Sequence, residues 1–247
     1  MADKRIIEGR NPVREALLGH CQIDEIIISA GPSSPGLRDI VRLAQDRHIR
    51  VKRVTQEEMA RLSRSRSHQG VIAVCPPYEY GDFTRLLESV RQSSRPALLV
   101  VLDGIEDPGN LGSIIRTSEC AGADGVVVRE RRAVGVTPAV EKAAAGATQH
   151  LPVCRVSNIR NALEQAKDAG IWVVGATGDS SRAYYEADLT VPLALVIGSE
   201  GKGLSRLVRE TCDYTVSVPM FGKISSLNAA VAAAIMMYEV VRQRLCR

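Results

Sequence analysis

The sequence lacks the patterns that usually mark metal sites, disulfide scaffolds and membrane segments. Its six cysteines lie far apart without a Cys-x-x-Cys pair, and its four histidines occur singly. Such spacing favours neither a zinc site nor a disulfide-rich fold, so no metal is expected. The N-terminus MADKRIIEGR has no apolar signal-peptide core, and the uncharged stretch 224–238 is too short to cross a bilayer. These absences predict a reduced, cytoplasmic protein with no membrane partner.

Aromatic residues are scarce, at 4% of a 247-residue chain that is 45% hydrophobic, so the core must rely on Val, Ile, Leu and Ala. The net charge is only +4, but the excess is local. Residues 1–70 hold 13 of the 32 basic and 9 of the 28 acidic residues, which leaves the rest of the chain balanced. A local basic excess suggests a polyanionic partner, although an ordinary solvated surface has the same composition.

Several common ligand-binding motifs are absent. The nearest match to a P-loop is GSEGKG at 198–203. In this segment a glycine follows the lysine, where a P-loop requires Ser or Thr. A dinucleotide fingerprint, a zinc-binding H-E-x-x-H and a nucleophile elbow are missing as well. A strand at 173–176 does run into a turn at Thr177 and Gly178, but this pattern is weak by itself.

Residues 1–76 predict a small α/β domain. Apolar spacing favours helices over 11–18 and 37–48 and strands over 23–29, 51–54 and 71–75. Thr55 followed by Glu58 predicts a capping box for a further short helix. Pro76-Pro77 then ends the last strand, and the polar stretch 77–96 suggests a linker with a helical turn or two.

From residue 97 onward, strands and helices alternate regularly. Strands are expected over 97–102, 125–128, 151–155, 171–176, 193–197 and 213–218, and helices over 110–121, 137–146, 157–169, 204–211 and 226–245. Strands that alternate with helices of this length indicate βαβ units. We therefore predict a second α/β domain over 97–247 with a mostly parallel sheet.

Three polar loops follow strands of this second domain, at 103–116, 195–205 and 216–228. In a parallel sheet all three emerge at the same edge, which is where open α/β sheets bind ligands. Asn110 stands where a helix N-cap is expected. Ser226 is a good N-cap for the final helix, which would leave Asn228 facing out of its first turn.

The segment 61–69 is rich in arginine and serine. Arg61, Arg64, Arg66 and His68 are candidate RNA contacts, because a guanidinium binds phosphate with two parallel hydrogen bonds. The alternative is a flexible, solvated loop.

The motifs N-L-G-S-I-I-R-T at 110–117, I-G-S-E-G-K-G-L at 197–204 and S-S-L-N-A-A-V-A at 225–232 resemble the three ordered motifs of the SpoU (TrmH-like) RNA 2′-O-ribose methyltransferases. The stretches G-R-N-P-V-R-E-A-L at 9–17 and H-Q-G-V-I-A at 68–73 resemble the substrate-binding domain of the RlmB-like subgroup, which has a ribosomal protein L30e-like α/β fold. That subgroup modifies a guanosine of large-subunit (23S) ribosomal RNA.

The resemblance implies a SPOUT-type catalytic domain whose C-terminal segment threads a trefoil knot. It also implies S-adenosyl-L-methionine as the methyl donor, bound in the knot. The cofactor-binding positions carried over are Gly198, Val218 and Leu227, to which we add Thr177, Gly178 and Gly203 as further candidates. For Val218 and Leu227 the alternative is ordinary core packing.

The resemblance assigns the key catalytic role to Arg116. A guanidinium is effectively always protonated, so stabilisation of developing alkoxide charge fits it better than action as a base. Asn110, Glu200, Ser226 and Asn228 complete the catalytic set, although Asn110 and Ser226 could be helix caps only, and Glu200 could be merely solvated. The family also implies a homodimer with catalytic groups near the subunit interface.

Two other functions remain compatible with the sequence. One is a transfer-RNA ribose methyltransferase of the same family. The other is a non-catalytic RNA-binding relative, because small α/β domains like residues 1–75 also occur in ribosomal proteins. The added N-terminal domain favours ribosomal RNA, and the intact Asn110, Arg116, Glu200 and Asn228 favour an enzyme.

Overall fold

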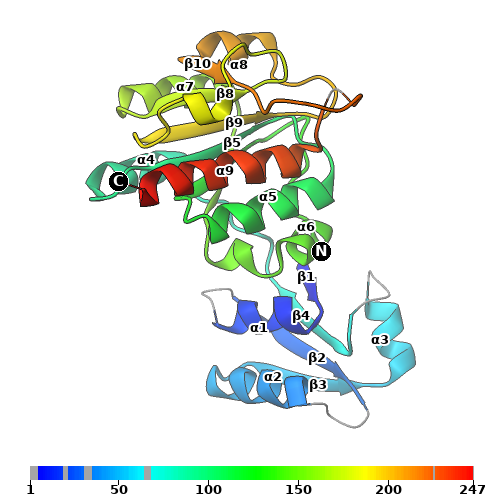
Figure 1. Cartoon of the computed structure of the whole chain (residues 1–247). Helices are drawn as coiled ribbons and strands as arrows, with labels where there is room; N and C mark the ends of the chain where they lie inside the picture. The colour runs from blue at the N-terminus through cyan, green and yellow to red at the C-terminus, as the bar shows by residue number, and fades with distance from the viewer. Residues whose placement is uncertain (1–4, 19–21, 31–34, 64–67, 225, 247) are drawn as a thin grey trace. The chain divides into compact units, whose positions relative to one another are not determined.

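The computed structural model describes residues 5–18, 22–30, 35–63, 68–224 and 226–246 (Figure 1). The chain divides into two compact units, one of Met1–Glu79 with Val136–His150, and one of Tyr80–Gly135 with Leu151–Arg247. The sequence did not predict that a segment from the middle of the second domain, Val136–His150, packs with the first unit.

The smaller unit is built on a mixed four-stranded sheet. Its strands are β1 (Arg5–Glu8), β2 (Glu25–Ser29), β3 (Arg50–Val54) and β4 (Val71–Cys75), in the order β1-β4-β2-β3. Only the β2–β3 pair is parallel. Its helices are α1 (Arg10–Leu18), α2 (Pro35–Asp46), α3 (Gln56–Leu62) and α6 (Pro138–Ala144), with a 3-10 turn η1 (Ala147–Gln149). Strand β1 was missed by the sequence analysis.

The two motif stretches of this unit meet in space. The backbone N–H of Gly9 donates to the carbonyl of Val71 at 3.3 Å. Arg10 donates to Gln69 twice, from its backbone N–H to Oε1 at 3.1 Å and from Nε to the carbonyl at 3.2 Å. The predicted capping box of Thr55 and Glu58 is confirmed at the start of α3.

The larger unit is built on a six-stranded, fully parallel sheet in the order β10-β8-β9-β5-β6-β7. The strands are β5 (Leu98–Asp103), β6 (Gly125–Arg129), β7 (Val153–Val156), β8 (Trp172–Ala176), β9 (Leu193–Gly198) and β10 (Tyr214–Val216). The helices are α4 (Phe83–Gln92), α5 (Pro108–Cys120), α7 (Ile159–Asp168), α8 (Arg206–Thr211) and α9 (Ala229–Leu245), with a 3-10 turn η2 (Tyr184–Glu186). The prediction of a mostly parallel α/β sheet is confirmed.

Helices cover both faces of this sheet (Figure 1). Side chains of α4, α7 and α8 pack with alternate strand residues such as Leu99 and Val101 in one core cluster. Helices α5 and α9 pack against each other, and the hydroxyl of Ser118 meets the sulfur of Met237 at 3.4 Å. Buried β5 is therefore enclosed on both sides, as its continuous apolar run predicted.

The stretch expected to be a linker, 77–96, is only partly one. Within it, α4 buries Phe83, Leu86, Leu87 and Val90 in the core of the larger unit. Asp82 caps this helix by accepting a hydrogen bond from the N–H of Arg85 at 2.9 Å. Four apolar residues at helical spacing outweigh the polar composition, because their burial fixes the helix against the sheet.

The trefoil knot stays a prediction of the family resemblance.

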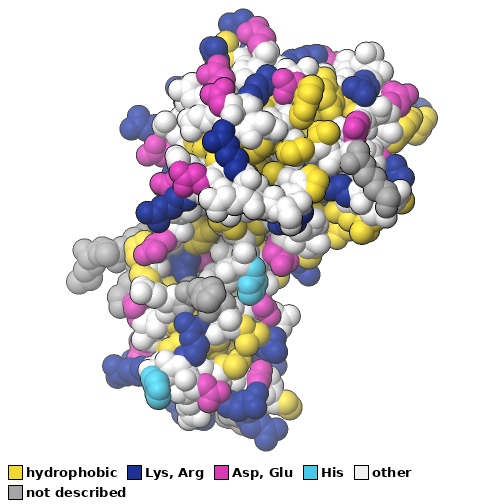
Figure 2. All heavy atoms as spheres, turned by 90° about the vertical axis from the view of Figure 1, so that its left-hand side faces the viewer, with side chains coloured by type: hydrophobic (Ala, Val, Ile, Leu, Met, Phe, Trp, Pro, Cys, Tyr) yellow, Lys and Arg dark blue, Asp and Glu magenta, His cyan; other side chains and the backbone are white. Residues whose placement is uncertain are grey.

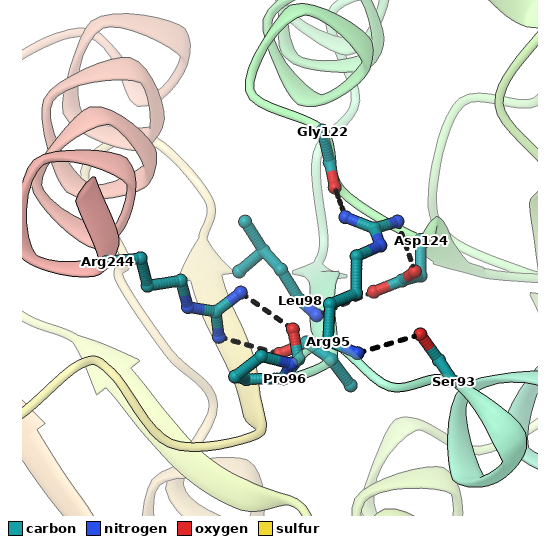
Figure 3. A network of polar contacts seen from close by, with 8 residues as sticks. Ser93, Arg95, Pro96, Leu98, Gly122, Asp124 and Arg244 are labelled. Atoms are coloured by element: carbon teal, nitrogen blue, oxygen red, sulfur yellow. Dashed lines mark hydrogen bonds and ion pairs between the residues drawn. The ribbon is translucent and has the colours of Figure 1, made fainter. Parts of the chain in front are cut away.

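A network of arginines fastens α9 to the beginning of β5 (Figure 3). Arg244 donates to the carbonyls of Pro96, Ala97 and Val191, each at 2.8 Å. Nearby, Arg95 bridges the carbonyl of Gly122 and the carboxylate of Asp124 (Figure 3). The end of the last helix is thus tied to the strand that enters the centre of the sheet.

Replacing Arg244 with Ala should lower the free energy of unfolding by about 2–4 kcal/mol, because three carbonyls lose a charged donor. Thermal unfolding followed by circular dichroism measures this change. Arg206, which forms an exposed pair with Glu210, supplies the control. Arg206→Ala should shift stability by no more than about 0.5 kcal/mol, and equal effects of the two substitutions would contradict the anchoring role.

Candidate functional site

The three predicted loops converge at the carboxyl edge of the parallel sheet. The Nδ2 amide of Asn110, in α5, donates to Oε1 of Glu200 at 2.9 Å. The Nδ2 amide of Asn228 donates to the same Oε1 and to Oδ1 of Asn110, the latter at 2.8 Å. The backbone N–H of Ala229, at the start of α9, also points at Glu200 Oε1, at 3.3 Å. One carboxylate therefore joins the three loops, and we call these three side chains the Asn–Glu–Asn cluster.

The helix caps differ from the prediction. Asp107, not Asn110, caps α5 by accepting from the N–H of Asn110 at 2.7 Å. Asn228, not Ser226, caps α9 by accepting from the N–H groups of Ala230 and Val231. Pro108 explains the first difference, because proline fits the first helical turn and moves the cap to the residue before it. The side chain of Asn110 is thereby left to bond across the site.

Arg116 does not join this cluster. It lies on α5 six residues beyond Asn110, which places it on another side of the helix. Its side chain is exposed, and within the described part of the chain no hydrogen bond or ion pair holds it. The guanidinium is therefore accessible to a polyanion from outside the protein.

A pocket of about 470 Å³ lies beside the cluster. This volume suits a small molecule, for which pockets of roughly 300–1,000 Å³ are usual. All six predicted cofactor-binding residues line it: Thr177, Gly178, Gly198, Gly203, Val218 and Leu227. Glu200 and Ser226 line it too, so the pocket and the Asn–Glu–Asn cluster share a residue.

Gly198 is required by a close approach of the backbone. Ser199 and Gly203 exchange two backbone hydrogen bonds, at 3.1 and 2.9 Å, so that the loop folds back on the end of β9. A Cβ atom at Gly198 would lie 2.2 Å from the carbonyl carbon of Gly203. Any side chain there must displace the loop, whereas a Cβ at Gly178 would meet nothing within 4 Å.

The pocket offers both polar and apolar partners for S-adenosylmethionine. The hydroxyl of Thr177 is buried beside the carboxylate of Asp179, and its hydrogen bonding contributes to the lowered pKa of that carboxyl. Val218 and Leu227 provide aliphatic walls for an adenine ring. These features fit the cofactor.

Two residues that sequence reasoning missed form an ion pair at the pocket. Arg209 donates to the carboxylate of Asp179 at 2.7 Å, and this hydrogen bond holds the pKa of Asp179 below its ordinary value. Both residues line the pocket. The position of Asp179 directly after the Thr177-Gly178 turn was the only signal in the sequence.

Asp103 connects the first loop to the second. It is buried at the end of β5, and its carboxylate accepts from the backbone N–H of Ser205 at 2.7 Å. A buried carboxylate needs such a partner. Asp103 therefore positions the loops rather than meeting the ligand.

The candidate RNA contacts of the smaller unit differ in their exposure and hydrogen bonding. Arg61 is exposed in the last turn of α3. His68 is partly buried, and its Nδ1 accepts from the backbone N–H of Gly70 at 3.1 Å. This bond gives His68 a role in its own turn. Arg64 and Arg66 lie outside the described residues.

The described residues contain no group of three or more His, Cys, Asp or Glu side chains arranged to hold a metal ion. Nor does any helix among them have the length and apolarity required to span a membrane.

A parallel α/β sheet with a glycine-lined pocket and a polar cluster at its carboxyl edge defines a class of small-molecule-binding α/β enzymes. Residues 97–238 match the SpoU rRNA Methylase family, and residues 6–81 match the RNA 2′-O ribose methyltransferase substrate-binding domain. The chain belongs to the SpoU family and is an RNA-binding methyltransferase that uses S-adenosylmethionine.

Relatives match over nearly the whole chain. A Staphylococcus saprophyticus protein, provisionally named a TrmH family tRNA/rRNA methyltransferase, is 45% identical over 97% of this chain and 96% of its own. The SpoU methyltransferase AviRb of Streptomyces viridochromogenes, solved with S-adenosylmethionine, is 30% identical with a TM-score of 0.84 over 100% and 92% of the two chains. An S-adenosylmethionine-bound rRNA methyltransferase of Sinorhizobium meliloti is 26% identical with a TM-score of 0.81 over 97% and 87%.

Gly198→Ala should close or distort the pocket, because its Cβ cannot fit beside Gly203. We expect a loss of about 2–3 kcal/mol of stability and at least about tenfold weaker binding of S-adenosylmethionine, measured by thermal unfolding and calorimetric titration. Gly178→Ala is the control for folding and should leave the melting temperature unchanged. A wild-type affinity in Gly198→Ala would show that the loop does not shape the pocket.

Proposed function

We propose that this protein methylates a ribose 2′-hydroxyl in RNA, at a guanosine of large-subunit (23S) ribosomal RNA. The observation that carries this proposal is the double use of Glu200. It lines the pocket proposed for the methyl donor and also anchors Asn110 and Asn228 from the other two loops. Polar groups that could orient a ribose thus border the cofactor pocket.

When bound, S-adenosylmethionine supplies a methyl group that its sulfonium charge already activates. The remaining task of the chain is to hold the acceptor hydroxyl in line and to help remove its proton. Thr177, Gly178, Gly198, Gly203, Val218 and Leu227 would hold the donor. Asn110, Asn228 and Ser226 would orient ribose or phosphate oxygens, and Glu200 would fix the two amides.

Arg116 would bind the phosphate next to the target and stabilise the developing alkoxide. Its exposed guanidinium suits this role because it is free of intramolecular partners within the described chain. Neither Cys154, which is buried, nor Cys212, which is partly buried, suits the role of a thiol base. Burial raises the pKa of Cys154 and of Cys212 to about 11, so both stay protonated at neutral pH.

The choice of ribosomal RNA rests on the smaller unit. Residues 6–81 match a substrate-binding domain, and the rRNA methyltransferase of Sinorhizobium meliloti aligns with 97% of this chain. The name of the staphylococcal relative covers both RNA classes, so transfer RNA is the second candidate. A cytoplasmic location is also part of the proposal.

A homodimer is part of the proposal. Helix α9 exposes Val231, Tyr238 and Leu245, whereas its Met236, Met237 and Val240 are buried. Phe221, in the third loop, is 97% exposed. Large apolar side chains left in solvent beside a site favour a protein interface.

The methylation itself can be mapped directly. Incubation of unmodified large-subunit rRNA with the protein and S-adenosylmethionine should yield one 2′-O-methyl guanosine, detected as a stop in primer extension at low nucleotide concentration and by mass spectrometry. Methylation of transfer RNA alone would transfer the proposal to the second candidate. Binding of S-adenosylmethionine without methylation of either RNA would contradict it.

Arg116→Ala should fold, bind S-adenosylmethionine normally and lose roughly 10²–10³-fold in kcat, the usual loss when an oxyanion-stabilising group is removed. Single-turnover methylation and calorimetric titration with the cofactor separate these effects. Arg116→Lys should recover only part of the activity, because lysine lacks the planar fork. Turnover near that of the wild type in Arg116→Ala would exclude the assignment.

Sedimentation equilibrium tests the dimer. The expected mass is about 53 kDa, twice the 26.7 kDa of the chain. Tyr238→Glu should shift the population towards monomer by placing a charge in an apolar interface. Leu207→Glu, at an exposed apolar position on α8, is the matched control and should leave the mass unchanged. A monomeric wild type would overturn this part of the proposal.

A further inference from the structure

The end of β6 and the loop that follows it are strongly basic and lie outside the three family motifs. Its sequence, R-E-R-R-A-V-G at 129–135, contains three arginines and one glutamate. A fourth arginine, Arg155, lies on the neighbouring strand β7, where its Cα pairs with that of Val128. We call Arg129, Arg131, Arg132 and Arg155 the arginine cluster.

The cluster lies at the same edge of the sheet as the candidate site. Strand β6 is parallel to β5 and next to it, so the loops after both strands leave the sheet at their carboxyl ends. The backbone N–H of Val134 donates at 3.0 Å to the carbonyl of Ile105, which precedes Asn110 in the first site loop. On the other side, the N–H of Glu130 donates to the carbonyl of Val156 at 2.9 Å. The basic loop is thus fixed between the site loop and β7.

The charges of the cluster are not neutralised within the protein. Among the described residues, none of its four guanidinium groups forms an ion pair with a carboxylate. Elsewhere in the same unit, the described arginines at 95, 160, 206, 209 and 242 have such partners, whereas those at 85, 91, 116, 182 and 244 do not. On the face drawn in Figure 2, Lys and Arg side chains are likewise interspersed with Asp and Glu. Glu130 is the acidic residue inside the loop, and Glu106 lies in the neighbouring loop.

The side chain of Arg155 is oriented by stacking on an aromatic ring. Its guanidinium stacks on the ring of Tyr80, 3.7 Å from the ring centre, while the residue as a whole stays exposed. A Cβ at Gly135 would lie 2.8 Å from the Tyr80 hydroxyl and 3.1 Å from Nη2 of Arg155. The end of the basic loop therefore packs directly against this stacked pair, which limits the freedom of Arg155 before binding.

Arg132 has an unusual backbone. Its φ is 59°, a left-handed conformation that side-chain-bearing residues seldom adopt. Such conformations persist where the surrounding structure enforces them, and they are common at binding sites. Here the turn keeps Arg131 and Arg132 exposed on the loop.

We propose that the arginine cluster, together with Tyr80, is a second RNA contact on the methyltransferase unit, which binds backbone phosphates of the strand beside the target nucleotide. Arginines without a carboxylate partner among the described residues, at one edge of the sheet, complement a polyanion, and arginine pairs with phosphate through two parallel donors. Because the contact is to phosphates, it supplies affinity and position rather than recognition of the base.

This inference rests on the proposed RNA substrate, but it concerns binding rather than the methyl transfer. The cluster belongs to positions other than those proposed to hold the cofactor or orient the ribose. Its loss should therefore raise the KM for RNA and leave both cofactor affinity and kcat at saturating RNA nearly unchanged.

The test compares two triple variants with equal changes of charge. One is Arg131→Gln with Arg132→Gln and Arg155→Gln. The control is Arg85→Gln with Arg160→Gln and Arg206→Gln, at exposed positions on α4, α7 and α8. Binding to unmodified, deproteinised large-subunit rRNA is measured by filter retention between about 50 and 200 mM salt, a range over which phosphate contacts weaken strongly.

The cluster variant should bind this RNA at least about tenfold more weakly, and the slope of log K against log salt should fall by about 2–3, close to one per lost phosphate contact. The control should keep the wild-type slope. Equal losses in both variants, or an unchanged slope in the cluster variant, would overturn the proposal. A loss seen with ribosomal particles but not with deproteinised RNA would also overturn it, in favour of a protein partner.

Two further measurements keep the result interpretable. Thermal unfolding and cofactor titration should match the wild type, and the single variant Arg131→Gln should show a smaller change in the same direction if the triple variant is unstable. Wild-type protein that binds RNA through the cluster but transfers no methyl group would contradict the proposed function alone. Methylation with unchanged RNA affinity in the cluster variant would contradict the cluster alone.

Discussion

The site depends on one carboxylate oxygen. Oε1 of Glu200 accepts from the amides of Asn110 and Asn228 and from the first backbone N–H of α9. These donors come from three loops that are far apart in the sequence and meet only because the strands before them are parallel. A negative charge is also favourable at the N-terminus of a helix. The same contact therefore closes the site and stabilises the start of the last helix.

Much of this arrangement could be predicted from the chain alone. The apolar run of β5 and the regular alternation after it predicted a parallel sheet, and parallel strands predicted the meeting of three loops. What failed was local. Asn110 and Ser226 were expected to cap helices, but Asp107 and Asn228 do so, because several polar residues near a helix start compete for one position and composition cannot choose between them.

Long-range packing was the other limit. Strand β1 is four residues long and gains its place from pairing with β4, which lies more than sixty positions later. Helix α4 lies in a polar stretch, yet Phe83 and Leu87 anchor it in the core. The arginine cluster could not be predicted from the sequence for the same reason. Arg155 and Tyr80 come close to the segment 129–135 only when β6 and β7 pair.

The return of Val136–His150 to the smaller unit has a consequence for how this molecule could arise and be rearranged. The chain passes between the units three times, after Glu79, Gly135 and His150, rather than once through a simple tether. Arg5 and Glu141, at opposite ends of this interlaced unit in sequence, form a buried ion pair at 3.2 Å. The smaller unit is therefore built from two separate stretches of the chain and is not one continuous N-terminal module. If the N-terminal segment were exchanged for that of another enzyme, the internal segment Val136–His150 would have to be exchanged with it. The sequences of these two segments are therefore expected to vary together.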